Sequence, residues 1–269
     1  MKLPQLGLGT FLMIDGAYET VKKALEIGYR HIDTAQLYQN EHLVGQALKE
    51  TNLKREDYFI TTKLSAKKLT YDDAIKELDI SLEKLGLEYV DLYLIHWPSQ
   101  DDQINLDTWR GMEKVYKEGK AKMIGVSNFQ IHHLDALLKE AKIKPMANQV
   151  EMHPGLQQHA LKAYLDKHDI KLISYGPFMK GEVFVKDGRY YETLNRIAKK
   201  HQATVAQVII AWGIKRGIYM IPKTVNESRL LENYQSLDVK LDQQDLKDIN
   251  VLNRGRRVYT DPDNFSFYE

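Results

Sequence analysis

Short apolar segments rich in β-branched and aromatic residues alternate with amphipathic helical segments along almost the whole chain. Seven strand-like segments end near residues 33, 63, 96, 127, 150, 175 and 222, and residues 6–10 provide one more at the start. The first intervals, roughly 25–33 residues each, fit one strand and one helix, and such alternation gives parallel strands joined by right-handed crossovers. Eight such units in 269 residues predict a closed (β/α)8 barrel.

The interval between residues 175 and 222 is too long for one helix. It contains two helical patterns, at residues 190–200 and 204–215, so we expect an additional helix or a long loop there. A helix is also expected over residues 72–85, where apolar residues recur at helical spacing. No stretch rich in proline, glycine or serine divides the chain, which predicts one domain over residues 1–269.

A doubly wound open sheet is the main competing architecture. It would carry a glycine-rich dinucleotide fingerprint directly after its first strand. Gly7 and Gly9 begin such a pattern, but Leu12 stands where the third glycine belongs, and no helical pattern opens immediately. The barrel is therefore favoured.

The composition argues against several kinds of function. Basic and acidic residues nearly balance, 38 against 37, so no general attraction to nucleic acid or to an anionic membrane is expected. The sequence has no cysteine, which excludes thiolate metal sites and a cysteine nucleophile. The first residues lack the apolar core of a signal peptide, and no segment is apolar for long enough to span a membrane. We therefore expect a cytoplasmic protein.

Nearly every strand-like segment ends in a hydrogen-bonding or ionisable residue. Each of them alone has a simpler explanation, such as a solvated lysine, a turn-capping aspartate or a structural histidine. In a barrel, however, the carboxyl ends of all strands meet at one mouth, where active sites lie. Seven polar strand ends at one mouth predict a functional site. The residues are Asp33 with Tyr38 just beyond it, Lys63, His96, Ser127, Asn128, Gln149, Glu151, Tyr175 and Lys223.

Four of these residues form a set that can protonate the oxygen of a carbonyl group. A free tyrosine, with an ordinary pKa of about 10, is a poor acid at neutral pH. A lysine ammonium within about 4 Å favours the phenolate by roughly 3 pKa units before desolvation opposes it. We therefore expect Lys63 to lower the pKa of Tyr38, Asp33 to keep Lys63 charged, and His96 to orient the carbonyl oxygen. Such a set supplies no hydride, so a reductase of this design needs a nicotinamide cofactor.

Several segments, in order along the chain, resemble the aldo-keto reductases. They are residues 28–41 (GYRHIDTAQLYQNE), similar to the second-strand signature of that family; 92–98 (LYLIHWP), similar to its histidine strand; 124–129 (IGVSNF) and 148–154 (NQVEMHP), similar to its amide-binding strands; and 221–233 (IPKTVNESRLLEN), similar to its adenosine-phosphate segment.

The resemblance implies an NADPH-dependent reductase of carbonyl compounds with one role for each matching residue. The implied catalytic tetrad is Tyr38, Lys63, Asp33 and His96. The implied cofactor contacts are Ser127, Asn128 and Gln149 to the carboxamide, Tyr175 to the nicotinamide face, Lys223, Thr224 and Arg229 to the 2′-phosphate, and Glu232 and Asn233 to the adenine. The implied walls of the substrate pocket are Phe11 and Trp97.

Other parts of the chain resemble one branch of this family or depart from its common pattern. The short segment 98–109 and the tail 261–269 look like the compact bacterial enzymes similar to 2,5-diketo-gluconate reductase, which reduce diketones and small aldehydes. Most relatives begin with a hairpin that plugs the barrel bottom, and here this plug is expected to be missing or minimal. Residues 174–184 (SYGPFMKGEVF) differ from the commoner sequence and leave the pyrophosphate contacts open.

Two other functions remain open at this point. A non-catalytic NADPH-binding barrel is disfavoured by the complete tetrad, and a phosphate-binding isomerase or lyase by the lack of a good glycine-rich loop after the last strands. No metal site is expected, because His132 and His133 are adjacent on a helix and would not face one ion together. We expect a monomer that acts on a small carbonyl compound.

Overall fold

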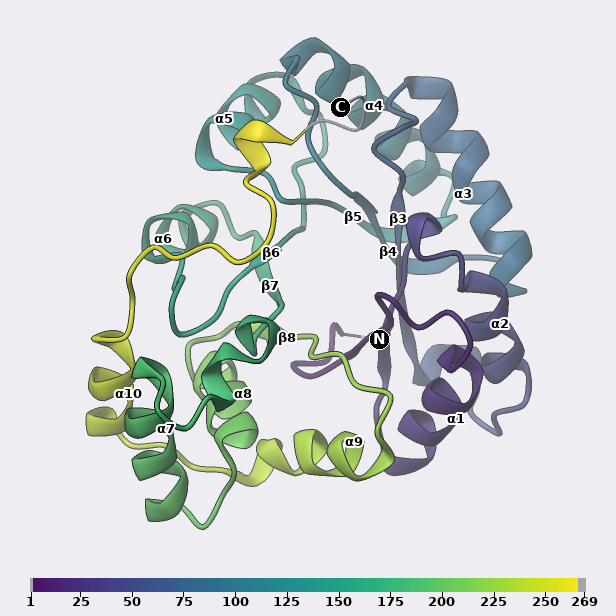
Figure 1. The fold of residues 1–269 in the computed structure, drawn as a ribbon. Helices are drawn as coiled ribbons and strands as arrows, with labels where there is room; N and C mark the ends of the chain where they lie inside the picture. Colours follow the sequence, from purple (N-terminus) through teal and green to yellow (C-terminus); the bar gives the residue numbers. More distant parts are fainter. Residues whose placement is uncertain (1, 266–269) are drawn as a thin grey trace.

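The computed structural model describes residues 2–265, in which eight parallel strands form one sheet in the order β1 to β8 (Figure 1). Backbone hydrogen bonds then join the last strand to the segment around the first. The N–H of Gly7 donates to the carbonyl oxygen of Met220 (2.8 Å), and the N–H of Met220 donates to the carbonyl oxygen of Gln5 (2.8 Å). The sheet therefore closes into the predicted barrel. The strands are β1 (Leu8–Gly9), β2 (His31–Asp33), β3 (Phe59–Leu64), β4 (Val90–Ile95), β5 (Ala121–Ser127), β6 (Ala147–Glu151), β7 (Lys171–Tyr175) and β8 (Tyr219–Met220).

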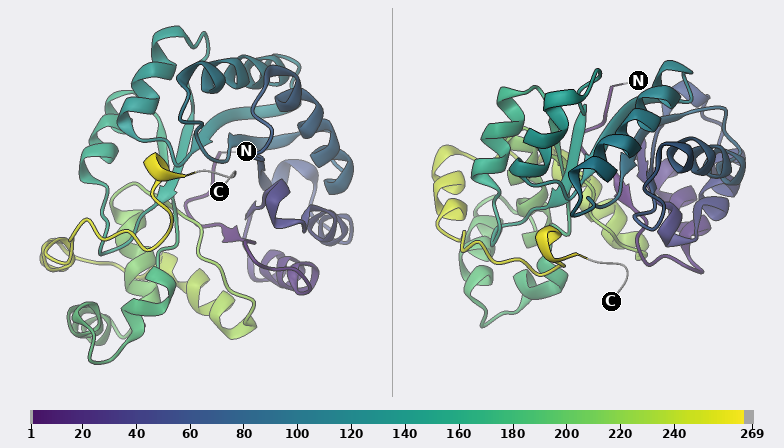
Figure 2. Two further views of the ribbon diagram at one scale, coloured as in Figure 1. Left: turned by 45° about the horizontal axis from the view of Figure 1, so that its top comes forward. Right: turned by 90° about the horizontal axis from the view of Figure 1, so that it is seen from above.

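Helices connect consecutive strands and surround the barrel (Figure 2). The interval between β7 and β8 holds two helices, α7 and α8, which confirms the additional helix expected there. The helix predicted over residues 72–85 is α3. The helices are α1 (Ala17–Ile27), α2 (Glu41–Lys49), α3 (Tyr71–Leu85), α4 (Asp102–Lys117), α5 (Ile131–Glu140), α6 (His159–Lys167), α7 (Arg189–Lys200), α8 (Val205–Lys215), α9 (Glu227–Tyr234) and α10 (Gln243–Asn250).

Helix α3 shows how local sequence sets these elements. The hydroxyl of Thr70 accepts a hydrogen bond from the N–H of Asp73 and caps the start of the helix. Gly86 ends it in the left-handed region, with φ of +66°. Between these ends, apolar residues at helical spacing are buried against the barrel: Ala74, Leu78, Leu82 and Leu85.

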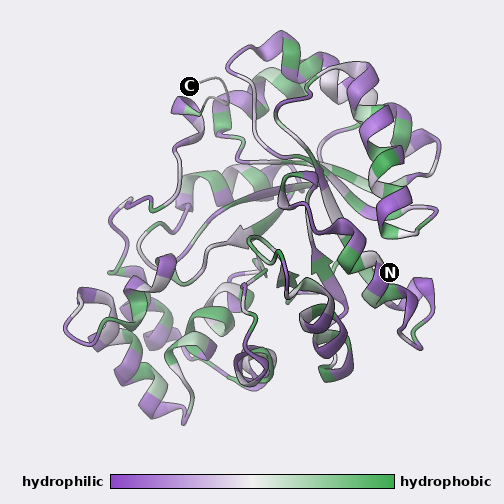
Figure 3. Ribbon diagram, turned by 45° about the vertical axis from the view of Figure 1, so that its right-hand side comes forward, coloured by the Kyte–Doolittle hydropathy of each residue, from purple (hydrophilic) through white to green (hydrophobic). Residues whose placement is uncertain are grey.

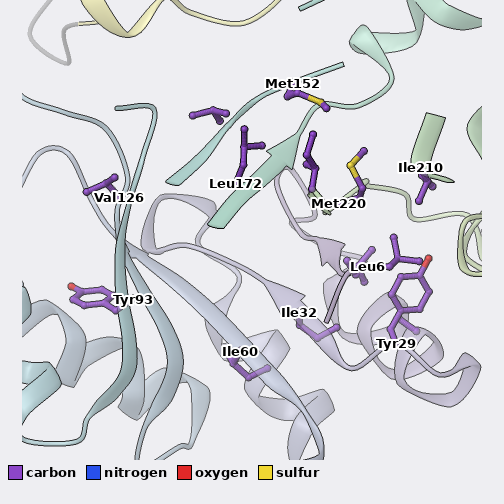
Figure 4. Close-up of a cluster of buried hydrophobic side chains, with 14 of the residues drawn as sticks. Leu6, Tyr29, Ile32, Ile60, Tyr93, Val126, Met152, Leu172, Ile210 and Met220 are labelled. Atoms are coloured by element: carbon purple, nitrogen blue, oxygen red, sulfur yellow. The ribbon is translucent and has the colours of Figure 1, made fainter. Parts of the chain in front are cut away.

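Most of the apolar core lies between the strands and the helices. Ile32 and Ile60 pair in register on β2 and β3 and belong to this layer, as do Val126 and Leu172 (Figure 4). The helices carry both hydrophobic and hydrophilic residues around their circumference, as expected for elements with one buried and one exposed face (Figure 3). No helix within residues 2–265 is long and apolar enough to cross a membrane.

A second, smaller core fills the inside of the barrel. Successive side chains of a strand point to opposite faces, so every other residue of each strand faces inward. Apolar inward residues fill much of the lower part of the barrel and include Phe59, Leu92, Leu94 and Ile173. His31 and Thr61 lie among them, with Nε2 of His31 2.9 Å from the Thr61 hydroxyl. Leu3 packs among the apolar residues, and residues 2–7 contain no hairpin. This agrees with the expectation of a missing or minimal plug.

Candidate active site

A cavity of about 1010 Å³ opens at the carboxyl ends of the strands. Eleven of the residues predicted for the site line this cavity. They are Phe11, Asp33, Tyr38, His96, Trp97, Ser127, Asn128, Gln149, Tyr175, Lys223 and Arg229. The barrel thus brings together residues from nearly the whole length of the chain, as the pattern of strand ends predicted.

Lys63 lies at the base of this cavity, behind Tyr38, and has no exposed surface. Its ammonium group donates three hydrogen bonds, to Oδ1 of Asp33 (2.5 Å), to the carbonyl oxygen of Thr34 (2.9 Å) and to the hydroxyl of Tyr38 (3.3 Å). All three N–H groups are therefore used. This arrangement fits a charged lysine held in place by a carboxylate, with its third proton directed at the tyrosine oxygen.

Burial acts against the charged form of every member of this group. It raises the pKa of Asp33, while Lys63 and Gln149 act in the opposite direction. It lowers the pKa of Lys63, again opposed by Asp33. Burial also raises the pKa of Tyr38 well above its ordinary value, and the charges of Asp33 and Tyr259 add to this effect. The expected lowering of the Tyr38 pKa by Lys63 is therefore wrong for this structure, because desolvation and the neighbouring acidic groups raise this pKa.

His96 completes the tetrad on the other side of Tyr38, with the two rings nearly perpendicular and their centroids 5.6 Å apart. Burial lowers the pKa of His96 well below its usual value, and the positive charge of Lys63 acts in the same direction. The imidazole is therefore neutral. Phe11 packs on the Tyr38 ring at 5.2 Å, so the phenol is held between two rings above Lys63.

The predicted carboxamide ligands form one hydrogen-bonded group that also reaches the tetrad. The Nδ2 atom of Asn128 donates to the hydroxyl of Ser127 (3.2 Å), and its Oδ1 atom accepts from the hydroxyl of Tyr175 (2.8 Å). The Nε2 atom of Gln149 donates to Oδ2 of Asp33 (2.6 Å). The amide-bearing side chains are thus positioned next to the groups that would carry out proton transfer.

The predicted phosphate contacts are only partly brought to the cavity. Lys223 and Arg229 line it, near the start of α9, whose first N–H groups favour an anion. The hydroxyl of Thr224 instead accepts a hydrogen bond from the N–H of Asn226 (3.1 Å). Thr224 does not line the cavity as the structure describes it.

The two residues predicted to contact adenine also lie outside the described cavity lining. Glu232 accepts a hydrogen bond from the hydroxyl of Thr204 at the start of α8 (2.6 Å), and Asn233 is buried. The roles assigned to Thr224, Glu232 and Asn233 therefore remain predictions.

Sequence reasoning missed several cavity residues on irregular segments. Phe178, Lys180 and Phe184 come from the segment after β7, and Tyr259 comes from the tail after α10. Neither segment has a regular period from which the direction of its side chains could be predicted. The left-handed backbone at Lys180 (φ +51°) and Gly181 (φ +98°) shows how irregular the first of them is.

The histidine pair on α5 does acquire a third neighbour, which the sequence argument did not foresee. One ligand atom from each of His132, His133 and Asp263 lies within 4.8 Å of the others. However, Nδ1 of His133 accepts a hydrogen bond from the N–H of Gln130 (3.1 Å), which places the proton of the neutral ring on Nε2. The group is not a ready set of metal ligands, and the absence of a metal remains a prediction.

Comparison with known proteins shows the family to which the chain belongs. The sequence model of the Aldo/keto reductase family matches residues 5–254. Glyoxal reductase of Bacillus subtilis (strain 168) is 45% identical over 269 residues, which cover 99% of this chain and 95% of that protein.

Solved structures of aldo-keto reductases also match this chain. MGS-M4, an aldo-keto reductase from a Medee basin deep-sea metagenome library, has a TM-score of 0.95 at 45% identity, over 99% of this chain and 97% of that one. A mutant of Gox0644 crystallised in complex with NADPH has a TM-score of 0.91 at 37% identity, over 98% of this chain and 95% of that one. The chain therefore belongs to the aldo/keto reductase family of oxidoreductases.

Proposed function

We propose that this protein reduces small uncharged aldehydes, ketones and dicarbonyls to alcohols, with NADPH as the hydride donor and Tyr38 as the proton donor. The observation that carries the proposal is the geometry at Lys63. A fully buried ammonium group donates to both Asp33 and the Tyr38 hydroxyl at the base of a large cavity. This geometry suits the protonation of an oxygen that gains negative charge.

The residues around the cavity fit NADPH. Ser127, Asn128 and Gln149 offer amide and hydroxyl groups for the carboxamide, and the ring of Tyr175 offers a face for the nicotinamide. A cavity of about 1010 Å³ is large enough for a dinucleotide and a small substrate. Its lining includes three cations, Lys180, Lys223 and Arg229, which suit the phosphates. When bound, the reduced nicotinamide supplies the hydride.

The chain's own residues would then orient and protonate the carbonyl oxygen of the substrate. His96 is neutral, so it can donate one hydrogen bond to this oxygen and orient the carbonyl group without adding a charge. Tyr38 keeps its proton until negative charge develops on the oxygen, since burial raises its pKa. As the proton moves from Tyr38 to the substrate, the ammonium group of Lys63 stabilises the phenolate that remains.

The character of the walls supports an uncharged substrate. Phe11, Trp97 and Tyr259 line the cavity with aromatic surface. We assign the three cations of the described lining to the cofactor phosphates, which leaves none to pair with a carboxylate on the substrate. The similarity to a glyoxal reductase supports a dicarbonyl as the first substrate to test.

The test is the consumption of NADPH, followed by its absorbance, with methylglyoxal and simple aldehydes as substrates. Wild-type protein should consume NADPH. Tyr38→Phe should lose about 10²–10⁴-fold in turnover, the size of a general acid contribution, while it still binds NADPH. NADPH binding without any turnover in the wild type would support the non-catalytic barrel instead. Absence of NADPH binding would leave the isomerase or lyase alternative.

We also propose that the protein acts as a monomer in the cytoplasm. The residues that we assign to proton transfer lie together within one chain, which supports the proposal of a monomer. The cytoplasm is where a reductase of this kind would find NADPH. Sedimentation analysis and cell fractionation test these two proposals.

A further inference from the structure

The segment after α10 runs as a strap across the mouth of the barrel. We call residues 253–265 the tail strap. In Figures 1 and 2 it passes from α10 beside α6 and on toward α5. Its backbone N–H groups at Arg254 and Arg256 both donate to the carbonyl oxygen of Gly155 (3.0 Å each). Farther along, the carbonyl oxygen of Pro262 accepts a hydrogen bond from Gln100 (2.8 Å), beyond β4.

The middle of the tail strap is anchored on the buried carboxylate of Glu151, which also pairs with Arg257 of the strap (3.6 Å). Its Oε1 accepts from the N–H of Val258 (2.6 Å), and its Oε2 from the N–H of Tyr259 (3.3 Å). Oε1 also accepts from Nε2 of His153 (2.8 Å). The proton of His153 lies on Nε2 because Nδ1 accepts from the N–H of Leu156 (3.2 Å). A fully buried carboxylate with three N–H donors thus fixes the backbone on either side of one tyrosine.

Tyr259 is held in a defined position in the cavity wall. Its ring packs edge-on against the ring of Tyr175, with centroids 5.3 Å apart. A Cβ atom at Gly176 would lie 2.4 Å from Cε2 of Tyr259, so the ring rests directly on the glycine backbone. The ammonium group of Lys180 lies 4.7 Å from the ring centroid on another side.

The hydroxyl of Tyr259 has no partner in the part of the chain that the structure describes. It forms no hydrogen bond with any group in the described range, residues 2–265, and it is not among the buried polar atoms. Burial of the ring raises the pKa of Tyr259, and the charge of Glu151 acts in the same direction, so the hydroxyl keeps its proton. Tyr259 lines the same cavity as Tyr38 and His96. A hydrogen-bond donor without a partner in residues 2–265 therefore lies in the wall of the cavity that Tyr38 and His96 also line.

We propose that Tyr259 determines specificity for dicarbonyl substrates, its hydroxyl donating a hydrogen bond to the second carbonyl oxygen while Tyr38 and His96 bind the first. Glu151 acts as the positioning residue that holds Tyr259 there. The proposal rests on the proposed carbonyl reduction and names the substrate feature that the same site recognises. A monocarbonyl compound has no second oxygen and gains nothing from this donor.

The direct test is Tyr259→Phe, which removes the hydroxyl and keeps the ring. For each protein, kcat/KM is measured for 2,3-butanedione and for 2-butanone, and the ratio of the two values is compared. The ratio should fall about threefold to tenfold in the variant, the contribution of one hydrogen bond between uncharged groups. Tyr116→Phe removes a hydroxyl from α4 outside the cavity and is the matched control. An unchanged ratio in Tyr259→Phe would overturn the proposal.

Glu151→Gln tests the positioning step. A glutamine side chain has one acceptor oxygen, so its NH2 group would face one of the three N–H donors. The tail strap should loosen, trypsin should cleave faster after Arg254, Arg256 and Arg257, and the substrate ratio should fall as in Tyr259→Phe. Faster cleavage with an unchanged ratio would refute the role of Glu151 in specificity.

If Glu151→Gln does not fold, the comparison of Tyr259→Phe with wild type still decides the role of the hydroxyl. Wild-type protein that binds NADPH but reduces neither ketone would refute the proposed function itself. That result is distinct from an unchanged ratio in an active enzyme.

Discussion

Replacing Lys63 with methionine separates the contribution of this residue to catalysis from its contribution to stability. Methionine keeps most of the length and volume of the stem, so the fully buried site should pack similarly. The three N–H donors are lost together. Asp33 then keeps only the hydrogen bond from Gln149, and the Tyr38 oxygen loses its contact with the cation.

The loss of stability and the loss of catalytic rate in Lys63→Met have different sizes. Breaking a buried ion pair by removing one partner lowers the free energy of unfolding by about 3–5 kcal/mol. Asp33 can reduce this loss by taking up a proton, which burial already favours. In catalysis, the missing hydrogen bond to a charged phenolate contributes about 1.5–3 kcal/mol. This corresponds to roughly a 10- to 150-fold decrease in kcat.

Adding Asp33→Asn to Lys63→Met tells the two effects apart, because the double variant has no buried charge left at this position. Urea unfolding should show that much of the lost stability returns, while kcat for a dicarbonyl stays as low as in Lys63→Met. NADPH affinity, measured by fluorescence titration, should change far less than kcat, because the phosphate contacts lie elsewhere. Lys68→Met removes an ion pair to Glu77 in which the lysine is half-exposed, and should change stability by at most about 1 kcal/mol.

Two results would refute this reasoning. Near-normal kcat in Lys63→Met would mean that the cation does not stabilise the phenolate during proton transfer. Recovery of kcat together with stability in the double variant would mean that Lys63 matters only for the structure of the site.

Three further predictions follow from the same geometry. First, burial lowers the pKa of Lys63 and raises that of Tyr38, so rising pH should remove the lysine proton before the tyrosine proton. A kcat–pH profile should therefore fall on its alkaline side as Lys63 loses its proton, and Lys63→Arg should move this fall to higher pH. Second, Arg229→Ala should weaken the binding of NADPH by about 1.5–3 kcal/mol and the binding of NADH much less, as measured by fluorescence titration. Equal losses of affinity for the two cofactors would exclude a contact between Arg229 and the 2′-phosphate. Third, Gly176→Ala should raise KM for carbonyl substrates, because the new methyl group meets the Tyr259 ring and Gly176 has φ of +61°; an unchanged KM would show that the ring moves aside without consequence.

The fold was predictable because each unit of the barrel carries its own signal in the sequence. The apolar runs before Asp33 and Lys63 ended where strands β2 and β3 end, to within one residue. The two helical patterns predicted at residues 190–200 and 204–215 likewise appear as α7 and α8. The order of the strands needed no further information, since parallel neighbours in a closed barrel follow the chain order.

The spatial grouping of the proposed tetrad was predictable for a related reason, while the catalytic roles of its members stay predictions. Its members Asp33, Lys63 and His96 lie at the ends of consecutive strands, so the topology alone places them side by side. Tyr259 was not predictable in this way. It belongs to an irregular segment whose position depends on contacts with Glu151, which is 108 residues earlier in the chain. No periodic pattern in the sequence connects Tyr259 with Glu151.

The pKa of Tyr38 shows a different limit of sequence reasoning. The sequence places a cation beside a phenol, and this favours the phenolate. It gives no measure of how completely the surrounding residues remove water, and in the structure desolvation decides the direction of the shift. The reversal changes the role assigned to Lys63. A phenol with a raised pKa is protonated throughout the neutral range, so the cation is not needed to release its proton in advance. An alkoxide forming on the substrate is a much stronger base than a phenolate and can take that proton directly. The ammonium group of Lys63, hydrogen-bonded to the Tyr38 oxygen, then stabilises the phenolate where and when it forms, and a preorganised charge is most effective in a site that excludes water.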